Sequence, residues 1–451
     1  MSIDRIGEIM KKGIFFFITL VFFVLGCNNS NKVNLNIIGE NASNLKALNA
    51  LKTEYETKTG IKISYHPYSF DDAFTKANQD FATGSGIYDI VMQYNFSLSS
   101  FVRNDYVYKI GDIRNNIPKE KMQFESDLFQ NAWHEIGYFK DQNDTSEVKI
   151  GYPFATNTMI LAYNKELFTK REFKDQFKLR YGKELLPPKN WDEYFQIAEF
   201  FTMKNRNLFG VCLQGSTGSW LYYEWCNFLF GMGGKFMDKK YGWEENNTKR
   251  ILLDSKEAIN ATNFYLKLKP FNAGDYLTVG AYEQIRLMKR GNIAMAIIWS
   301  DLAYELVNEG DDKYDERFGF VTIPGNISGL AGGSFFINKK SKHPEQALNY
   351  IVDVLQKENQ IKLIQQGLCS PLKSAYEANE VRNIPYLQAL KESLARGKYM
   401  YEAGIDASMI SEKVTTYIQK IWKGDIGVEK GLSLMKEEIE KERAILYKGV
   451  K

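Results

Sequence analysis

From residue 33 onward the chain alternates strand-like and helix-like segments, and this alternation constrains its fold more than any other feature. Residues 33–38 read Val-Asn-Leu-Asn-Ile-Ile, in which apolar and polar side chains alternate as in a half-buried strand. Ser43 is then a candidate N-cap, apolar residues recur at helical spacing over 45–55, and Gly60 is a stop signal. Residues 61–65 form a second strand-like segment. A strand, a helix and a strand in this order predict a right-handed parallel crossover and therefore an α/β fold.

The alternation continues over most of the chain. A further strand is predicted at 88–92, and the later strands are expected at 209–213, 293–298 and 318–321. Long amphipathic helices are predicted at 191–204, 255–269, 344–358 and 428–446. The 451 residues include 44% hydrophobic and 25% charged residues, an ordinary globular composition. This length suggests two domains of the α/β kind.

The first 27 residues have the pattern of a secretory signal. Lys11 and Lys12 precede an apolar run at 14–26, which is shorter than the ~20 residues of a membrane-spanning helix. Cys27 follows Val-Leu-Gly, and this segment resembles the lipobox of bacterial lipoprotein signals, although a cysteine by chance is the alternative. We therefore expect residues 1–26 to be a signal peptide. Residues 27–32 would then tether the mature protein to a bacterial membrane through acyl chains such as palmitate, facing the periplasm or the outside.

Charge and cysteine content argue against several classes of function. The net charge is +3 at pH 7, so the chain lacks the strongly basic face that nucleic-acid binding needs, and no nucleic acid is expected as a partner. Four cysteines occur without a CxxC pair, which argues against a zinc or redox motif. Cys212 and Cys226 could pair in an oxidising compartment, but buried free thiols are the more common state. We expect no metal and no cofactor.

Several segments in order resemble the sugar-type extracellular solute-binding proteins of ABC importers, the family that includes maltose-binding protein. The resemblance extends over nearly all of the chain after the signal and depends on order and spacing rather than on one motif. Pro-Lys-Asn-Trp-Asp-Glu at 188–193 is similar to a helix start of the family, with Asn190 in place of the usual threonine. The other segments are Lys-Thr-Gly-Ile-Lys-Ile at 58–63, Tyr-Asp-Ile-Val at 88–91, Gly-Tyr-Pro-Phe at 151–154, Tyr-Asn-Lys at 163–165, Met-Lys-Arg-Gly-Asn-Ile-Ala-Met at 288–295 and Gly-Gly-Ser-Phe-Phe-Ile at 332–337.

The resemblance implies the type II periplasmic-binding-protein fold, in which two α/β lobes joined by a hinge enclose a ligand cleft. Gly332 and Gly333 suit a hinge, since glycine permits large changes in φ and ψ, whereas an ordinary turn at a strand edge is the alternative. The expected lobes are 33–152 plus 333–372 for the first and 153–332 plus 373–451 for the second.

The ligand-binding residues should lie just past strand ends that face the cleft. Sugars present flat C–H faces and hydroxyl groups, so aromatic rings and a few planar polar groups are the side chains to look for. In the family, aromatic residues at the positions of Trp220 and Trp299 commonly stack on sugar rings, although tryptophans in general pack in cores. Residues 405–409 contain no aromatic residue where maltose-type members often have one, which disfavours a long maltodextrin. The predicted ligand-binding residues are Glu40, Tyr94, Asn95, Trp220, Tyr223, Trp299, Asp301 and Gly333.

The resemblance implies a substrate-binding lipoprotein of an ABC transporter. It would capture a mono- or oligosaccharide in the cleft and deliver it to the permease subunits, as a monomer that performs no chemistry.

Other solutes and other classes of function remain open. The adjacent Tyr222 and Tyr223 could ligate ferric ion in this fold, but the three histidines form no cluster in the sequence. A polyamine, a sugar phosphate or a peptide are further alternatives. A surface enzyme acting on polysaccharide would need two suitably spaced carboxylates, and the chain shows no nucleophile elbow, HExxH motif or P-loop. A purely adhesive lipoprotein is the last alternative.

Overall fold

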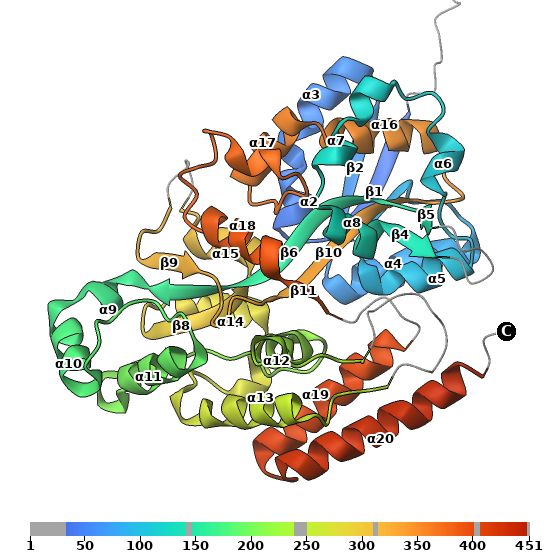
Figure 1. Ribbon diagram of the computed structural model, residues 1–451. Coiled ribbons are helices and arrows are strands. Elements are labelled where there is room, and N and C mark those ends of the chain that lie inside the picture. Colours follow the sequence, from blue (N-terminus) through green and yellow to red (C-terminus); the bar gives the residue numbers. More distant parts are fainter. Residues whose placement is uncertain (1–32, 141–146, 239–249, 310–313, 401–405, 449–451) are drawn as a thin grey trace, which may run out of the picture.

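The computed structural model describes residues 33–140, 147–238, 250–309, 314–400 and 406–448. The predicted signal peptide, Cys27 and the tether therefore lie outside the described residues. Within the described ranges, no helix is both long enough and apolar enough to cross a membrane. The elements form an upper and a lower group in Figure 1, which we call lobe 1 and lobe 2.

A nine-stranded sheet extends through both lobes. Its strands are β1 (Asn34–Glu40), β2 (Lys62–Tyr68), β3 (Ile90–Tyr94), β6 (Tyr152–Asn164), β7 (Phe209–Val211), β8 (Ile293–Trp299), β9 (Phe318–Val321), β10 (Gly329–Ile337) and β11 (Lys398–Tyr399). The order is β2-β1-β3-β10-β6-β8-β7, with β11 paired to β10 and β9 paired to β6. β1 pairs in parallel with both β2 and β3, which confirms the predicted crossover.

The two longest strands, β6 and β10, connect the lobes. β6 pairs with β10 over residues 152–158 and with β8 and β9 over residues 159–164. β10 also pairs with β3 over residues 333–337. All residues of β10, and all but one of β6, are buried. Because both faces of these strands are covered, they form a core that the two lobes share.

Helices cover the sheet on both sides in each lobe, as Figure 1 shows. Lobe 1 contains α2 (Ser43–Ala47), α3 (Asn49–Thr59), α4 (Phe70–Thr83), α5 (Leu98–Arg103), α6 (Ile110–Ile113), α7 (Phe124–Asp127), α8 (Gln130–Gly137), α16 (Pro344–Val354) and α17 (Lys357–Gln365), with a small hairpin of β4 (Tyr138–Lys140) and β5 (Glu147–Lys149). Lobe 2 contains α9 (Lys165–Thr169), α10 (Arg171–Tyr181), α11 (Trp191–Phe201), α12 (Trp220–Gly231), α13 (Lys256–Lys267), α14 (Ala281–Met288), α15 (Ser300–Val307), α19 (Ala407–Lys423) and α20 (Val428–Leu446). The remaining helix, α18 (Leu387–Arg396), packs against β6 and β9.

Local sequence signals explain several helix ends. Gly60 ends α3 in the left-handed conformation, with φ of 73°, as its position after the helical pattern predicts. The side chain of Asn190 accepts a hydrogen bond from the backbone N–H of Glu193 at 2.9 Å, so Asn190 caps α11. The prediction that Ser43 is an N-cap is wrong, because its hydroxyl instead donates to the backbone carbonyl of Asp301 in lobe 2, at 3.2 Å.

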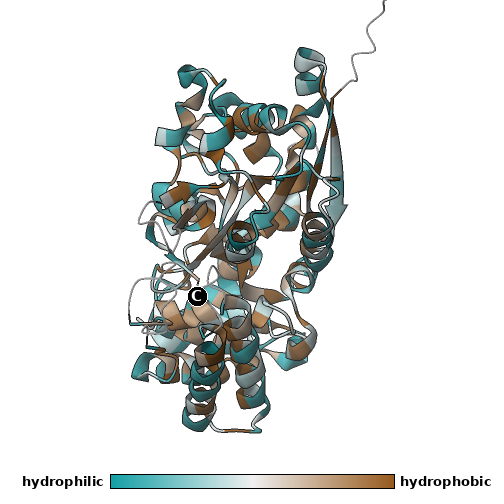
Figure 2. Ribbon diagram, turned by 90° about the vertical axis from the view of Figure 1, so that its right-hand side faces the viewer, coloured by the Kyte–Doolittle hydropathy of each residue, from teal (hydrophilic) through white to brown (hydrophobic). Residues whose placement is uncertain are grey.

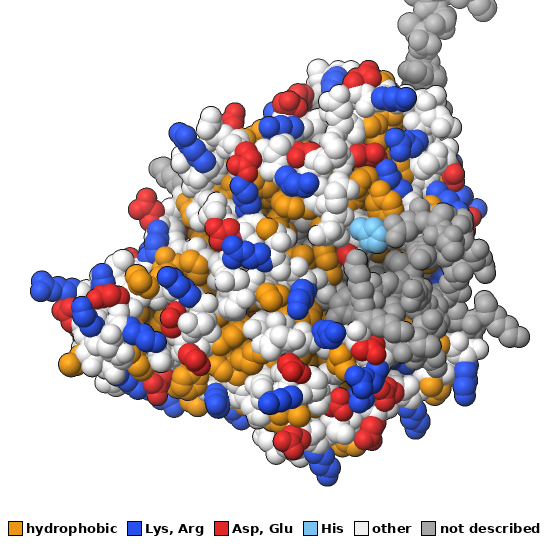
Figure 3. All heavy atoms as spheres, viewed as in Figure 1, with side chains coloured by type: hydrophobic (Ala, Val, Ile, Leu, Met, Phe, Trp, Pro, Cys, Tyr) orange, Lys and Arg blue, Asp and Glu red, His pale blue; other side chains and the backbone are white. Residues whose placement is uncertain are grey.

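Hydrophobic residues line the central strands, and hydrophilic residues predominate on the outer sides of the helices, as Figure 2 shows. On the face drawn in Figure 3, Lys and Arg side chains are interspersed with Asp and Glu. Cys212 and Cys369 are buried free thiols, so no disulfide joins Cys212 to Cys226.

The adjacent Gly332 and Gly333 lie inside β10, and neither has a positive φ. A Cβ atom on Gly333 would lie 2.4 Å from the ring of Phe154 and 2.7 Å from the carbonyl oxygen of Gln93. A Cβ atom on Gly332 would lie 2.7 Å from the carbonyl oxygen of Ala155. Glycine is therefore required here for close packing between strands, whereas the hinge role of this region stays a prediction.

We expect Gly333→Ala to lower the melting temperature by several degrees, because overpacking a core typically costs ~1–3 kcal/mol. Differential scanning calorimetry would measure the shift. Gly111→Ala is a matched control in lobe 1, since a Cβ there meets no atom within 4 Å and alanine favours the helix. An unchanged melting temperature for Gly333→Ala would show that the strands can separate without cost.

Candidate functional site

A cavity lies between the two lobes, where β1, β3 and β8 end. Its empty volume is about 480 Å³, part of it open to solvent, which is within the range of small-molecule sites. The two lobes meet across it, since Tyr282 of lobe 2 reaches Glu40 of lobe 1. The lining residues are Glu40, Phe70 and Tyr94 from lobe 1, Trp220, Tyr223, Tyr282, Trp299, Asp301 and Leu302 from lobe 2, and Asn157 and Ala331 from the connecting strands.

Six of the eight residues predicted from the sequence line this cavity. Glu40, Tyr94 and Trp299 are each the last residue of a strand, namely β1, β3 and β8. Asp301 follows in the first turn of α15, and Trp220 and Tyr223 lie in the first turn of α12. The carboxyl ends of the strands thus place the predicted groups together, although their contact with a ligand stays a prediction.

The other two predicted residues, Asn95 and Gly333, adjoin the cavity without lining it. Asn95 is buried directly after Tyr94, and Gly333 pairs with Tyr94 and with Ala155 in the sheet. Trp225, expected in the core, is fully buried, and its Nε1–H donates to Thr262 at 3.0 Å.

The sequence reasoning missed five lining residues. Phe70 lies two residues after the end of β2, so the strand-end rule applied to β2 would have found it. Asn157 lies in the middle of β6, Tyr282 in α14 and Ala331 in β10, where that rule gives no signal. Leu302 follows the predicted Asp301 directly.

Hydrogen bonds across the cavity join the lobes. Tyr94 in lobe 1 donates to Glu40 Oε2 at 2.6 Å, and Tyr282 in lobe 2 donates to Glu40 Oε1 at 3.0 Å. Asp301 accepts from the side-chain amide of Asn157 at 3.1 Å and from that of Asn44 in lobe 1 at 3.5 Å. Each carboxyl group is thus held by one side chain of its own lobe or the connecting strands and by one of the opposite lobe.

The two carboxyl groups titrate above their ordinary ranges. Burial raises the pKa of Glu40, although the hydrogen bonds from Tyr94 and Tyr282 oppose the rise. Burial also raises the pKa of Asp301 to about 7, and the negative charge of Glu40 adds to the effect. At neutral pH the closed cavity therefore favours a proton or another cation on this pair.

Aromatic rings form the walls. Tyr223 packs edge-on against Trp299 with ring centroids 5.1 Å apart, and Trp220 packs edge-on against Tyr282 at 6.2 Å. Two buried polar atoms in these walls, Trp299 Nε1 and Asn157 Oδ1, have no hydrogen-bond partner among the described residues. Buried polar groups are nearly always paired, so these two atoms indicate the place of a ligand's polar groups.

A second cavity adjoins the first and shares Phe70 and Tyr223 with it. Its empty volume is about 1060 Å³, part of it open to solvent. Phe70, Phe74 and Phe96 of lobe 1 pack together at ring-centroid distances of 5.5 and 5.2 Å and face α19, whose lining residues are Ala407, Ser408, Ser411, Glu412, Thr415, Thr416 and Gln419. The start of α19 contributes no aromatic residue, as the sequence shows, but lobe 1 supplies rings opposite it.

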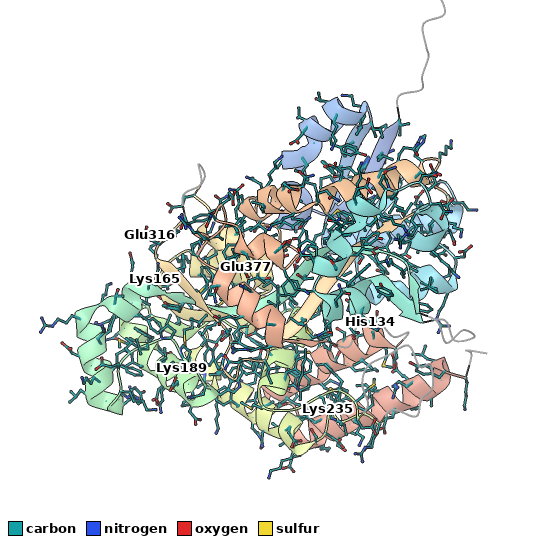
Figure 4. All side chains as sticks on the ribbon, turned by 45° about the horizontal axis from the view of Figure 1, so that its top comes forward. His134, Lys165, Lys189, Lys235, Glu316 and Glu377 are labelled. Carbon is teal, nitrogen blue, oxygen red and sulfur yellow. The ribbon has the colours of Figure 1, made fainter. Side chains whose placement is uncertain are left out.

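A groove of about 1670 Å³ empty volume lies on the opposite face of β10, because Leu330 lines it whereas the next residue, Ala331, lines the first cavity. His134 on α8 and Lys235 in lobe 2 lie on its two sides (Figure 4). Lys373 and Lys398 also line it. The lysines of this groove, which Glu135 and Asp238 also line, thus lie on the face of β10 away from the aromatic cavity.

The structure offers little for a metal. Within the described residues, no group of three His, Cys, Asp or Glu side chains is placed to hold a metal ion. Glu224, next to the tyrosine pair, is fully buried in lobe 2, where burial raises its pKa well above the ordinary value. A carboxyl group with so high a pKa is a poor ligand for ferric ion, so Glu224 is not suited to complete an iron site beside Tyr222 and Tyr223.

Residues 50–389 match the model of a family described as bacterial extracellular solute-binding protein. A curated relative, a probable amino-acid ABC transporter periplasmic-binding protein of Sinorhizobium fredii, is 20% identical over 308 residues, or 68% of this chain. The match spans 65% of that relative, less than two thirds of its length.

Several solved structures are similar over nearly their whole length. A solute-binding protein of Agrobacterium radiobacter in complex with ribitol is 18% identical, with a TM-score of 0.73 over 91% of this chain and 98% of that chain. One from Thermotoga lettingae bound with α-D-tagatose is 19% identical, with a TM-score of 0.73 over 91% and 100%. A maltose-bound protein of T. maritima is 16% identical, with a TM-score of 0.72 over 90% and 99%. These likenesses confirm the predicted two-lobe binding-protein fold.

Proposed function

The chain belongs to the family of bacterial extracellular solute-binding proteins, and from this premise we propose that it captures a carbohydrate between its lobes for an ABC importer. The observation that carries the proposal is the cavity itself. Rings of Tyr94, Trp220, Tyr223 and Trp299 surround a few fixed polar groups, which is the combination that a sugar's C–H faces and hydroxyls require. The ribitol, tagatose and maltose in the similar structures support this class of ligand.

An amino acid, suggested by the name of the curated relative, fits the cavity less well. The α-carboxylate of an amino acid needs a cationic or dense N–H partner. Among the described residues that line the two aromatic cavities, none is Lys or Arg. The same argument disfavours a sugar phosphate.

Capture works by closure of the lobes, with residues 33–152 plus 333–372 moving against residues 153–332 plus 373–451. Lobe 1 contributes Glu40 and Tyr94, whereas lobe 2 contributes Trp220, Trp299 and Asp301. A ligand that touches both sets favours the closed form, because some of its contacts exist only there. β6 and β10, which pass between the lobes, are the place where the bending occurs. The protein performs no chemistry in this process and works as a monomer that docks on the permease.

The family places the protein outside the cytoplasmic membrane, and the proposed anchor is a lipid on Cys27. We expect Cys27→Ser to release the protein from the membrane fraction, because the lipid would be the attachment. Fractionation followed by Triton X-114 partition would measure it, with Cys369→Ser as the control, since that buried thiol carries no expected lipid. Continued membrane attachment of Cys27→Ser would contradict the lipoprotein assignment.

The experiment that tests the function is a thermal-shift panel on the chain from residue 28 onward. The panel contains polyols, mono- and oligosaccharides, amino acids, sugar phosphates, a polyamine and ferric citrate. A ligand present at 100 times its Kd should stabilise the fold by about 2.7 kcal/mol, which gives a clear upward shift. A shift with one sugar class supports the proposal, whereas a shift with amino acids or iron alone contradicts it.

A further inference from the structure

Apart from tyrosines, the side chains with acidic or basic groups that line the two aromatic cavities are all carboxyl groups. Glu40 and Asp301 line the first, and Asp71 and Glu412 line the second. The described lining residues of both cavities include no Lys, Arg or His. Lys46 in α2 pairs with Glu305 at 4.0 Å, and its side chain is more than half exposed.

Buried carboxylates are normally paired with a cation. Asp301 is 7% exposed and Glu40 is partly buried at the end of β1. Glu40 accepts hydrogen bonds from Tyr94 and Tyr282, and Asp301 accepts them from Asn157, Asn44 and backbone N–H groups, so no Lys or Arg side chain is among these partners. The two carboxyl groups come from opposite lobes and repel each other when both are ionised, as the rise in the pKa of Asp301 caused by Glu40 shows. A positive charge from outside the chain would relieve both the repulsion and the burial.

The aromatic walls suit the same charge. A cation over the face of a tryptophan or tyrosine ring is attracted by the ring quadrupole, and aromatic rings beside carboxylates are a common surrounding for organic ammonium groups. Trp220, Tyr223 and Trp299 are all within the cavity that holds the carboxyl pair.

The unpaired polar atoms show that the ligand is more than an amine. Trp299 Nε1–H is a donor only, so its partner on a ligand must be an acceptor. A polyamine in its protonated form has donors alone, whereas a sugar supplies hydroxyl and ring oxygens that accept. Asn157 Oδ1, an acceptor, would receive a hydroxyl or ammonium proton.

We propose that the ligand is a cationic carbohydrate, a sugar bearing a protonated amine that sits between Glu40 and Asp301 while its oxygens reach Trp299. The proposal deepens the carbohydrate assignment and rests on it. The adjoining cavity, which Asp71 and Glu412 line together with Phe70, Phe74 and Phe96, offers the same chemistry to a second amino-sugar unit.

The test compares matched forms of the same sugars by isothermal titration calorimetry at pH 7. The probes are glucose, glucosamine and N-acetylglucosamine, the corresponding galactose set, the disaccharide chitobiose with free and with acetylated amines, and spermidine. We expect a free-amine sugar to bind at least ten times more tightly than its hydroxyl and N-acetyl counterparts. Asp301→Asn should weaken binding of the amine form at least tenfold more than it weakens binding of the matched neutral sugar, while Glu40→Gln should act in the same direction.

Asp254→Asn is the matched control, since this lobe 2 carboxylate pairs with Lys436 and lines neither cavity. Circular dichroism checks that each variant is folded. If a neutral sugar binds tightly and its amine form binds more weakly, the inference is overturned but the proposed carbohydrate function is retained. Binding of spermidine alone, or of no sugar in any form, would overturn both.

Discussion

Replacing Trp299 by alanine is expected to weaken carbohydrate binding by about 30-fold or more, which corresponds to about 2 kcal/mol. The ring ends β8, forms a wall of the inter-lobe cavity and presents a buried Nε1–H with no partner in the described structure. The substitution removes both a stacking face and a hydrogen-bond donor. Isothermal titration with the sugar identified by the panel would measure the loss.

The control must separate ligand contact from loss of packing, because Trp299 is only 6% exposed and its removal also costs stability. Trp422 in α19 is equally buried in the same lobe, stacks on Tyr276 at 3.8 Å and lines neither aromatic cavity. Trp422→Ala should therefore lower the melting temperature but keep the Kd within about threefold. If both variants lose binding equally, Trp299 acts through the stability of lobe 2 and not through the ligand.

Much of the fold could be predicted from the sequence because its signals are local. The alternation at 33–38 and 61–65 gave two strands that pair in parallel, and the positive φ of Gly60 at the end of α3 follows from its place in the pattern. Several predicted bounds were wrong: the helix predicted at 344–358 is divided into α16, which ends at Val354, and α17, which begins at Lys357, and the helix predicted at 191–204 ends at Phe201. Element type was thus more predictable than element boundaries.

The candidate site was predictable where it obeys a rule about strand ends. Glu40, Tyr94 and Trp299 were found because the carboxyl ends of strands meet at one edge of a sheet. The strand-end rule missed Asn157 because this residue lies inside β6, at the point where the strand passes from one lobe to the other. Tyr282 was missed because it lies in a helix of lobe 2 and meets Glu40 of lobe 1 across the cavity.

Contacts between the lobes are the part of the structure that local sequence patterns do not predict. Ser43 has the sequence context of a helix cap, yet its hydroxyl bonds to the backbone of a residue 258 positions later. Asn44 bonds to the side chain of the same residue, Asp301. The side chains at the start of α2 therefore bond to lobe 2 instead of capping their own helix, and this contact is visible only in the folded structure.

Closure of the ligand-free protein should become less favourable as the pH rises from about 4 to 7, by up to tenfold per pH unit. When the lobes close, Ser43 and Asn44 cover Asp301, and burial raises the pKa of Asp301 to about 7. When they open, water reaches the carboxyl group and its pKa falls towards the ordinary value of ~3.9. The closed form thus binds a proton that the open form releases in this window, and above pH 7 both forms are ionised and the dependence ends.

Small-angle X-ray scattering across pH 4–8 would measure the change as a growing radius of gyration, and Asp301→Asn should flatten it, because the amide has no proton to exchange. The charged and polar groups that face this carboxyl are those of Asn44, Asn157, Glu40 and Glu305, with Lys46 paired to Glu305. A cationic sugar competes with the proton for the carboxyl groups of Glu40 and Asp301. Its affinity should therefore rise as the pH rises from about 4 to 7, the range in which closure of the ligand-free protein becomes less favourable. If the radius of gyration of the unaltered protein does not change with pH, the prediction is contradicted, because protonation of the carboxyl pair would then not depend on whether the lobes are closed.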